Sequence, residues 1–277
     1  MSNKITIHET AFVTAAFRAG DTGISKDHYA HLWANESIEE HAVRYSSTVS
    51  AYEPYAHCLR NRYFYDTLVD LIDHDEVEVL INFGCGFSMY PYLLNKDLIY
   101  IEIDKLDVIT HKHQKITEWQ EQGLLPYREV HYIAADFNMP SMEDLYHQIV
   151  PLKENKRSFI LLEGVLFFLG KEDTNRLFNL FERLQGPDEY LASVSFQPQL
   201  EKSKVFHKLI EFVESNLEKN QQFQYQTVKD GYYKNRRGYK LIDHQDTFSL
   251  SAYYDPGRVL PNEEVLNEHM YLLKRNK

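Results

Sequence analysis

The stretch Val77-Glu-Val-Leu-Ile-Asn-Phe-Gly-Cys-Gly86 decides how the chain folds. It is a short run of β-branched and apolar residues that ends abruptly in Gly-x-Gly. Such a run predicts a strand buried on both faces, followed by a tight turn. Because Gly84 and Gly86 have no Cβ, the backbone can turn sharply there and a ligand can approach it closely. In an open α/β sheet, nucleotide-like ligands bind at this place, the carboxyl end of the first central strand.

Downstream of Gly86, apolar strands alternate with helical segments at regular spacing. This alternation predicts a parallel sheet wound by right-handed crossovers. The further predicted strands are Leu98–Asp104, Val130–Asp136, Ser158–Glu163 and Glu189–Phe196. The predicted helices between and after them are Ser88–Leu94, Lys105–Glu121, Ser141–Val150 and Glu172–Leu184.

The segments on either side of this core have a different character. Before it, Ser37 and Glu40 form a capping-box pattern that predicts a helix from Ile38 to Tyr52, with Pro54 as its stop. Arg60–Ile72 is expected to be a second helix. After the core we expect a long helix at Glu201–Asn220, loops and a strand in residues 222–258, and a closing strand at Met270–Lys274. We therefore expect one domain, with a helical cap at 1–75, a cofactor-binding core at 76–196 and a substrate-side region at 197–277.

Composition limits the partners of the chain. Its 277 residues carry a formal net charge of −11 and no lysine- or arginine-rich tract, which argues against nucleic acid as a main partner. Two cysteines cannot build a disulfide framework, and no apolar run approaches the length of a signal sequence core or a membrane span. We expect a soluble cytoplasmic protein without a membrane partner. The sequence leaves its oligomeric state open.

Acidic residues end three successive predicted strands. They are Glu102 or Asp104, Asp136 and Glu163. Because the carboxyl ends of parallel strands share one edge of a sheet, these acids should surround the crevice beside the two glycines. They suit a ligand with ribose hydroxyls, an amino group or a positive charge. The alternative interpretation is that each acid only caps the following helix.

The residues after Gly86 bear on which ligand binds. A dinucleotide site usually has a third glycine, which lets the helix pack closely over a pyrophosphate. Here the run is Gly84-Cys-Gly-Phe-Ser-Met89, without that glycine. It favours an adenosyl ligand without pyrophosphate, namely S-adenosylmethionine. An NAD-dependent oxidoreductase and a non-catalytic protein that binds S-adenosylmethionine or S-adenosylhomocysteine remain as alternatives.

Several motifs between Thr14 and Phe181 together resemble a known family. The pattern resembles class I S-adenosylmethionine-dependent methyltransferases, and within them the leucine carboxyl methyltransferase family, which includes small-molecule O-methyltransferases. The Leu162–Leu169 segment, Leu-Glu-Gly-Val-Leu-Phe-Phe-Leu, is the most specific motif. The other motifs are Thr14-Ala15 with Arg18-Ala19, Asn61–Phe64 followed by Asp66, Phe83–Gly86, Tyr100–Asp104 and Ala134–Phe137.

The resemblance implies a Rossmann-like fold: a largely parallel seven-stranded sheet with an antiparallel last strand and helices on both faces. It also implies cofactor-binding roles for nine residues. Arg62, with Arg18 as a second candidate, would hold the cofactor carboxylate, and Glu163 would lie near its amino group. Gly84 would lie beside the methionine moiety, and Gly86 would also contact the cofactor. Glu102 or Asp104 would lie at the ribose, and Asp136 with Phe137 at the adenine. The chain departs from the family at Phe87-Ser88-Met89, where Asp-Thr-Arg is frequent, and at Lys105, where proline is frequent.

The methyl acceptor is less well marked. We expect O-methylation of a small-molecule hydroxyl or a carboxylate, and the sequence names no general base. Tyr232, Tyr233, Arg236, Tyr253 and Tyr254 are weak candidates for lining an acceptor pocket, the alternative being ordinary packing beside a solvated loop. His111 and His113 lack a third ligand at metal spacing, so no metal site is expected. Cys85 lacks a base partner in the sequence and is interpreted as structural.

Overall fold

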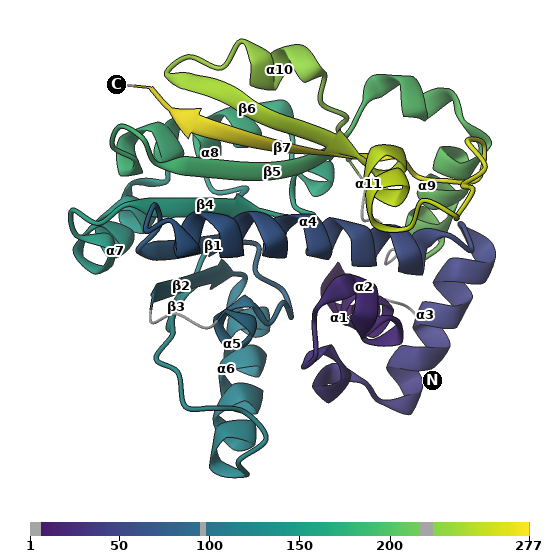
Figure 1. Cartoon of the computed structure of the whole chain (residues 1–277), viewed down its shortest axis with the longest axis horizontal. Coiled ribbons are helices and arrows are strands. Elements are labelled where there is room, and N and C mark those ends of the chain that lie inside the picture. Colours follow the sequence, from purple (N-terminus) through teal and green to yellow (C-terminus); the bar gives the residue numbers. More distant parts are fainter. Residues whose placement is uncertain (1–6, 95–97, 217–223, 277) are drawn as a thin grey trace.

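A single seven-stranded sheet forms the centre of the protein (Figure 1). The computed structural model describes residues 7–94, 98–216 and 224–276. The strand order is β3-β2-β1-β4-β5-β7-β6, with β1 to β5 parallel and β7 antiparallel to both of its neighbours. The predicted fold class is therefore confirmed. The strands are β1 (Val79–Phe83), β2 (Ile99–Asp104), β3 (His131–Ala134), β4 (Ser158–Leu162), β5 (Tyr190–Phe196), β6 (Tyr239–Asp246) and β7 (Glu268–Arg275).

The stretch quoted first provides the central strand. All five residues of β1 are buried, as a strand covered on both faces requires. β1 pairs with β2 on one side and β4 on the other, and the strand order reverses between β1 and β4. In doubly wound sheets a ligand crevice opens at the carboxyl ends of the two strands that flank such a reversal. This topology places the glycine turn and the predicted acids at one edge.

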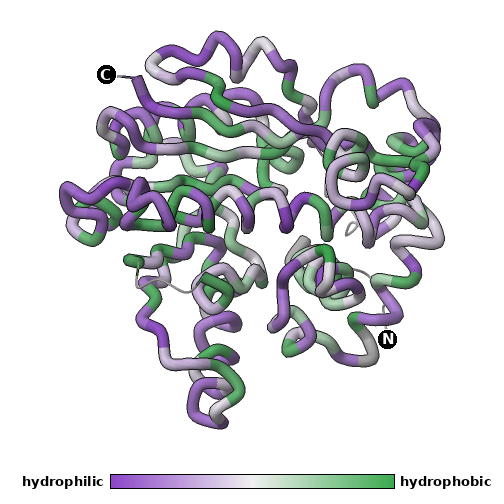
Figure 2. The backbone as a smooth tube through the Cα atoms, in the orientation of Figure 1, coloured by the Kyte–Doolittle hydropathy of each residue, from purple (hydrophilic) through white to green (hydrophobic). Residues whose placement is uncertain are grey.

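Helices cover both faces of the sheet. On one face, α7 (Glu143–Lys153), α8 (Lys171–Leu184) and α10 (Asp230–Lys234) pack on Ile81, Ile103 and Ile160. On the other face, α4 (Glu53–Asp73), α5 (Tyr90–Leu93) and α11 (Thr247–Tyr254) pack on Leu80 and Leu161. Figure 2 shows hydrophobic residues along the central strands between these helices. The core therefore lies in two apolar layers, one on each face.

The N-terminal helices lie across the carboxyl edge of the sheet. They are α1 (Ile7–Gly20), α2 (Thr22–Ser25), the short 3-10 helix η1 (Ala30–Trp33) and α3 (Glu36–Thr48). Trp33 of η1 and Ala15 of α1 share an apolar cluster with α5 and with Val108 and Ile116 of α6 (Leu106–Glu121). This packing fixes α1 beside the glycine turn.

Two N-terminal helix boundaries differ from the prediction. α3 ends at Thr48 rather than Tyr52, and its N-cap is Asn35, whose side chain accepts the N–H of Ile38. α4 begins at Glu53, not at Arg60. Pro54 stands in the first turn of α4, where a missing N–H costs no helical hydrogen bond, so it begins a helix rather than ending one.

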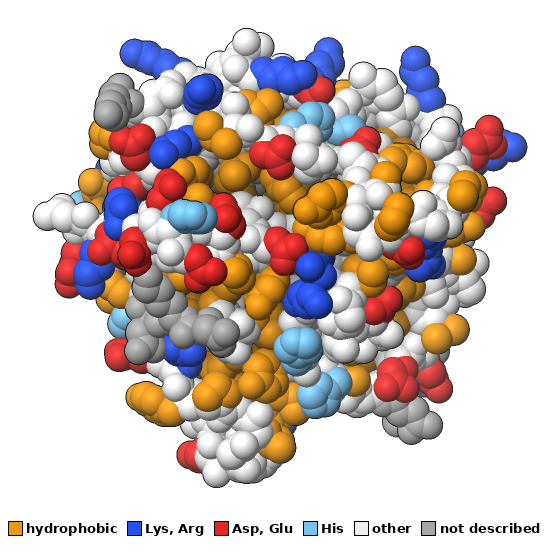
Figure 3. Space-filling model, in the orientation of Figure 1, with side chains coloured by type: hydrophobic (Ala, Val, Ile, Leu, Met, Phe, Trp, Pro, Cys, Tyr) orange, Lys and Arg blue, Asp and Glu red, His pale blue; other side chains and the backbone are white. Residues whose placement is uncertain are grey.

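The last third contains more regular structure than predicted. The predicted helix at 201–220 is divided into a 3-10 helix η3 (Pro198–Lys202) and α9 (Lys204–Asn216), and its last four positions lie outside the described residues. The region 222–258, predicted as loops and a strand, holds α10, β6 and α11. The closing strand β7 is confirmed and is longer than predicted. No helix in the described part of the chain has the length and apolarity of a membrane span. Acidic and basic side chains are interspersed over the face drawn in Figure 3.

Candidate functional site

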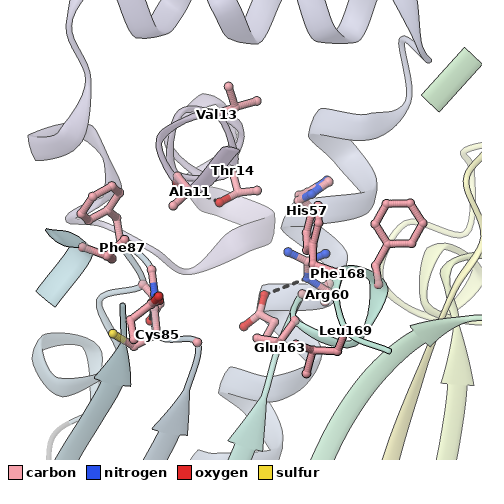
Figure 4. A pocket seen from close by; sticks show the side chains of 18 of the residues that line it. Ala11, Val13, Thr14, His57, Arg60, Cys85, Phe87, Glu163, Phe168 and Leu169 are labelled. Carbon is pink, nitrogen blue, oxygen red and sulfur yellow. Dashed lines mark hydrogen bonds and ion pairs between the residues drawn. The ribbon is translucent and has the colours of Figure 1, made fainter. Parts of the chain in front are cut away.

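A cavity of about 300 Å³ opens at the carboxyl ends of β1, β2 and β4. Its floor is the glycine turn after β1 together with the residues that follow β2, β3 and β4. α1 lies over it and α4 borders one side, as Figure 4 shows, where Ala11 and Thr14 point down between Cys85 on one side and Glu163 on the other. The cavity has two parts. We call the part at the glycine turn the inner part, and the part beyond Glu163 the outer part.

The glycine turn has a backbone that only glycine adopts easily. Gly84 and Gly86 have φ angles of 70° and 44°. A Cβ on Gly84 would lie 2.0 Å from Cγ2 of Val165, so no larger residue fits there without a shift. The N–H of Gly84 donates to the carbonyl of Ile103 at 2.7 Å. The turn is therefore held against the end of β2 and leaves its open side to the cavity.

The two acids of β2 have different surroundings. Asp104 lines the cavity, and its Oδ2 accepts the N–H of Gly86 at 2.8 Å. Burial raises the pKa of Asp104, although the N–H groups of Gly86 and Lys105 oppose the shift. Glu102 lies behind it, outside the cavity, and its Oε2 pairs with Nζ of the fully buried Lys112 at 2.8 Å. Of the two alternatives, only Asp104 lines the cavity.

The residues after β3 are brought to the cavity as a pair. Asp136 is exposed at its rim, where its Oδ1 accepts the backbone N–H of Asn138 at 3.0 Å. Phe137 is buried beneath it and contacts the ring of Phe83, with centroids 5.9 Å apart. An acid above an aromatic ring suits a flat heterocycle with an amino group.

A buried ion network crosses the middle of the cavity. Nε of Arg60 donates to Glu163 at 2.8 Å (Figure 4). Nη1 of the same side chain donates to Glu268 at 2.6 Å. The other oxygen of Glu163 accepts the hydroxyl of Tyr90 at 3.0 Å. The two carboxylates raise the pKa of Arg60, so the guanidinium is charged. The network joins α4, the end of β4 and the last strand.

The two arginines predicted to bind the cofactor carboxylate lie in different places. Arg18 lines the cavity, where its Nε pairs with Asp27 at 2.8 Å and its Nη2 donates to the carbonyl of Phe87 at 3.0 Å. Arg62 does not line the cavity. It pairs with Asp66 at 2.7 Å and lies over the ring of Tyr254. Arg60, two residues earlier, points into the cavity instead, because neighbours at i and i+2 face different sides of a helix.

The outer part of the cavity was not foreseen from the sequence. Glu53 and His57 of α4 line it, with Tyr45 of α3 hydrogen-bonded to Glu53 at 3.2 Å. Glu53, His57 and Arg60 are spaced by four and three residues, so they share one helix face. Interpreting Pro54 as a first-turn residue rather than a stop would have revealed this face. The apolar wall comes from α1, η2 (Leu166–Phe168), β5 and α9: Phe17, Phe167, Phe168, Phe196, Leu209, Phe212 and Val213.

None of the five weak acceptor-pocket candidates lines this cavity. Tyr232 and Tyr233 belong to α10, where Tyr233 is fully buried and stacks on Tyr271. Arg236 pairs with Glu182 at 2.7 Å. Tyr253 is exposed, and Tyr254 donates to Asp66 at 2.9 Å. Apart from the exposed Tyr253, these side chains pack on the sheet and its helices outside the cavity.

The cysteine considered as a nucleophile and the two histidines considered as metal ligands are buried or packed against neighbouring rings. Burial raises the pKa of the Cys85 thiol. His111 makes edge contacts with Phe12 and Phe87, and His113 stacks on Tyr132.

A histidine pair lies elsewhere, at the carboxyl end of β5. His244 and His269 are within hydrogen-bond distance at 2.9 Å, with Asp230 beside them. The amide nitrogen of Gln197 lies among these groups, donating to Asp230 and lying 3.1 Å from Nδ1 of His269. Hydrogen bonding between α10, β6, β7 and the residue that follows β5 accounts for this cluster.

Comparison with known proteins agrees with the geometry. A family model described as leucine carboxyl methyltransferase matches residues 9–182, more than half of the chain. A search of curated proteins gives no match. Among solved structures, a candidate methyltransferase of Thermobifida fusca is similar, with TM-score 0.67, 12% identity, and 99% of this chain and 96% of that chain covered. A DUF574 family protein of Streptomyces avermitilis has TM-score 0.65 and 13% identity, covering 96% and 97%. At these identities the structural likeness establishes the fold.

Proposed function

The chain belongs to the leucine carboxyl methyltransferase family of class I S-adenosylmethionine-dependent methyltransferases, and on that premise we propose that it methylates an oxygen atom of a small molecule. Its cofactor is S-adenosylmethionine, which supplies a methyl group on a sulfonium centre. The observation that carries the proposal is the two-part cavity, in which an outer part walled by aromatic rings adjoins the inner part at the glycine turn. A largely apolar cavity of this kind is typical of sites for small molecules.

The residues of the inner part fit the cofactor. Gly84 lines the cavity and has no Cβ, so a ligand can approach its backbone closely. We assign Asp104 to the ribose hydroxyls, Asp136 and Phe137 to the adenine, and Glu163 to the amino group. An acid at the end of the second strand is the usual partner of ribose hydroxyls in such sheets.

We assign the cofactor carboxylate to Arg60, with Arg18 nearby, in place of Arg62. Two bonds occupy Nε and Nη1 of Arg60, and Nη2 has no hydrogen-bond partner within the described part of the chain. That nitrogen lies beside Gly164, at the boundary between the two parts of the cavity. A guanidinium held by two carboxylates is already oriented, so it can bind a third at little entropic cost.

The rival functions have less support. An NAD-dependent enzyme usually has a sheet of six parallel strands, whereas β7 here is antiparallel. A non-catalytic binder would need no acceptor space, yet the outer part of the cavity is open beside Glu163. We also propose a cytoplasmic location, on the ground that Cys58 and Cys85 are both free.

Calorimetric titration tests the proposal. Purified protein should bind S-adenosylmethionine and S-adenosylhomocysteine with micromolar affinity and NAD not at all. Arg60→Ala should lose this binding, whereas Arg62→Ala, the matched control two residues away, should keep it. Glu163→Gln, which retains the shape of the side chain, serves if Arg60→Ala does not fold. Binding of NAD alone, or of none of the three ligands, would refute the assignment.

A further inference from the structure

The outer part of the cavity indicates what kind of acceptor the enzyme takes. We propose that it binds an uncharged hydroxyl compound with an apolar or aromatic body, and that Nε2 of His57 accepts the hydroxyl proton during methyl transfer. This inference rests on the proposed function and makes its acceptor specific. Four observations carry it: the wall, the orientation of His57, the charges around it, and the balance of charge in the reaction.

The wall of the outer part is almost wholly apolar. The ring of Phe167 meets that of Phe196 edge-on, with centroids 5.4 Å apart, and Phe212 meets Tyr45 in the same way at 5.0 Å. Leu209 and Val213 of α9 complete this side. Such a wall stabilises a flat or branched hydrocarbon body, at roughly 25 cal/mol for each Å² removed from water.

The hydrogen bonds of His57 fix which of its nitrogens is free. Nδ1 lies 2.9 Å from the carbonyl oxygen of Glu53. A carbonyl oxygen only accepts, so Nδ1 carries the proton and Nε2 keeps its lone pair. Burial and the neighbouring charges of Arg60 and Arg18 lower the pKa of His57 well below its usual range. The imidazole is therefore neutral at physiological pH, with a free acceptor nitrogen in a ring that lines the cavity.

The charges around His57 disfavour an anionic acceptor. Glu53, Glu163 and Glu268 all line the cavity. The last two share the guanidinium of Arg60, and Arg18, the other arginine that lines the cavity, is paired with Asp27. Burial and the charge of Glu268 raise the pKa of Glu53 to about 8, so even this carboxyl keeps its proton at neutral pH. A carboxylate acceptor would bring a further negative charge to this place. A carboxylate also needs no base, whereas a hydroxyl does.

The reaction keeps the total charge of the cavity constant. The hydroxyl oxygen forms a bond to the methyl carbon, the carbon–sulfur bond breaks with its electron pair on sulfur, and the hydroxyl proton moves to Nε2 of His57. One positive charge leaves the sulfonium and one appears on the imidazole. The carboxyl of Glu53 lies 3.8 Å from Nδ1 and faces this new charge. Phe17 packs edge-on against the other side of the ring at 5.3 Å and holds it in place.

A matched pair of probes tests the acceptor class. 2-Naphthol and 2-naphthoate have the same ring system and differ in carrying a hydroxyl or a carboxylate. Each is titrated calorimetrically into the protein saturated with S-adenosylhomocysteine. We expect 2-naphthol to bind at least about tenfold more tightly, a difference of about 1.4 kcal/mol. Phe212→Ala should weaken 2-naphthol binding and leave S-adenosylhomocysteine binding unchanged. Tighter binding of 2-naphthoate, or binding of neither probe, would overturn the inference.

A single substitution tests the base. The amide of His57→Asn can still donate to the carbonyl of Glu53 but offers no nitrogen in place of Nε2. Transfer of labelled methyl from S-adenosylmethionine to 2-naphthol should fall by about 100-fold or more, while both dissociation constants change less than about threefold. Undiminished transfer in the variant, or no transfer by the unaltered protein, contradicts the role of His57. If S-adenosylhomocysteine itself does not bind, the proposed function fails first and this inference falls with it.

Discussion

Replacing Glu53 by glutamine should change how the stability of the protein depends on pH. Burial raises the pKa of Glu53 from its ordinary value of 4.5 to about 8 in the folded protein. The folded chain therefore keeps a proton that the unfolded chain releases, so the contribution of Glu53 to stability is greatest below pH 4.5 and falls as the pH rises towards 8. Each pH unit in this interval costs about 1.4 kcal/mol. Between about pH 5.5 and 8 the unaltered protein should lose roughly 3 kcal/mol that Glu53→Gln does not lose.

Urea denaturation at a series of pH values measures this difference directly. The free energy of unfolding of Glu53→Gln, minus that of the unaltered protein, should rise steadily over the interval and level off above pH 8. Glu121→Gln, at an exposed position on α6, serves as the control, and its curve should run parallel to that of the unaltered protein. Parallel curves for Glu53→Gln as well would show that Glu53 ionises as in water. The account of a protonated acid beside His57 would then be wrong.

Three further substitutions test the inner part of the cavity and the buried acid behind it. Gly84→Ala places a methyl group against Val165 at a positive φ. It should cost about 1–3 kcal/mol of stability and weaken S-adenosylhomocysteine binding more than about tenfold. An unchanged midpoint of thermal unfolding together with an unchanged calorimetric affinity would contradict this. Asp104→Asn should lower that affinity by roughly 1.5–3 kcal/mol with little loss of stability. Glu102→Gln should keep the affinity and lose stability, because it leaves Lys112 buried without a counter-charge. We expect a loss of about 3–5 kcal/mol in the free energy of unfolding, measured by urea denaturation. Equal binding losses in the last two variants would refute the distinction between the two acids.

Local signals in the sequence were enough to predict the parallel strands of the sheet. β1 is short, fully apolar and followed by glycines, and the next four strands repeat its pattern at the spacing of right-handed crossovers. The acids at the strand ends follow from the same rule, so Asp104, Asp136 and Glu163 could be placed at one edge before any coordinates were known. The rule does not distinguish Glu102 from Asp104, because both lie on one face of the strand and only depth separates them.

The outer part of the cavity depends on contacts that no local pattern contains. Pro54 is compatible with either a helix end or a helix start, and the choice decides whether Glu53 and His57 lie on a helix at all. The face of α4 on which each residue lies also decides that Arg60, and not Arg62, points into the cavity. Glu268 reaches Arg60 across 208 positions of sequence, a pairing that periodicity cannot reveal. The tyrosine-rich segment around Tyr233 was a candidate for the acceptor pocket because of its composition alone. Tyr233 and Tyr239 pack in the hydrophobic core instead.

The position of Glu268 on the last strand has a consequence for synthesis of the protein on the ribosome. β7 inserts between β5 and β6, and only then does its carboxylate meet the arginine of α4. Until β7 has left the exit tunnel, a nascent chain can fold β1 to β5 but holds Arg60 against one acid instead of two. Chains cut short before β7 should therefore leave that arginine under-neutralised and the flank of β5 uncovered. Such chains are expected substrates for chaperones and proteases.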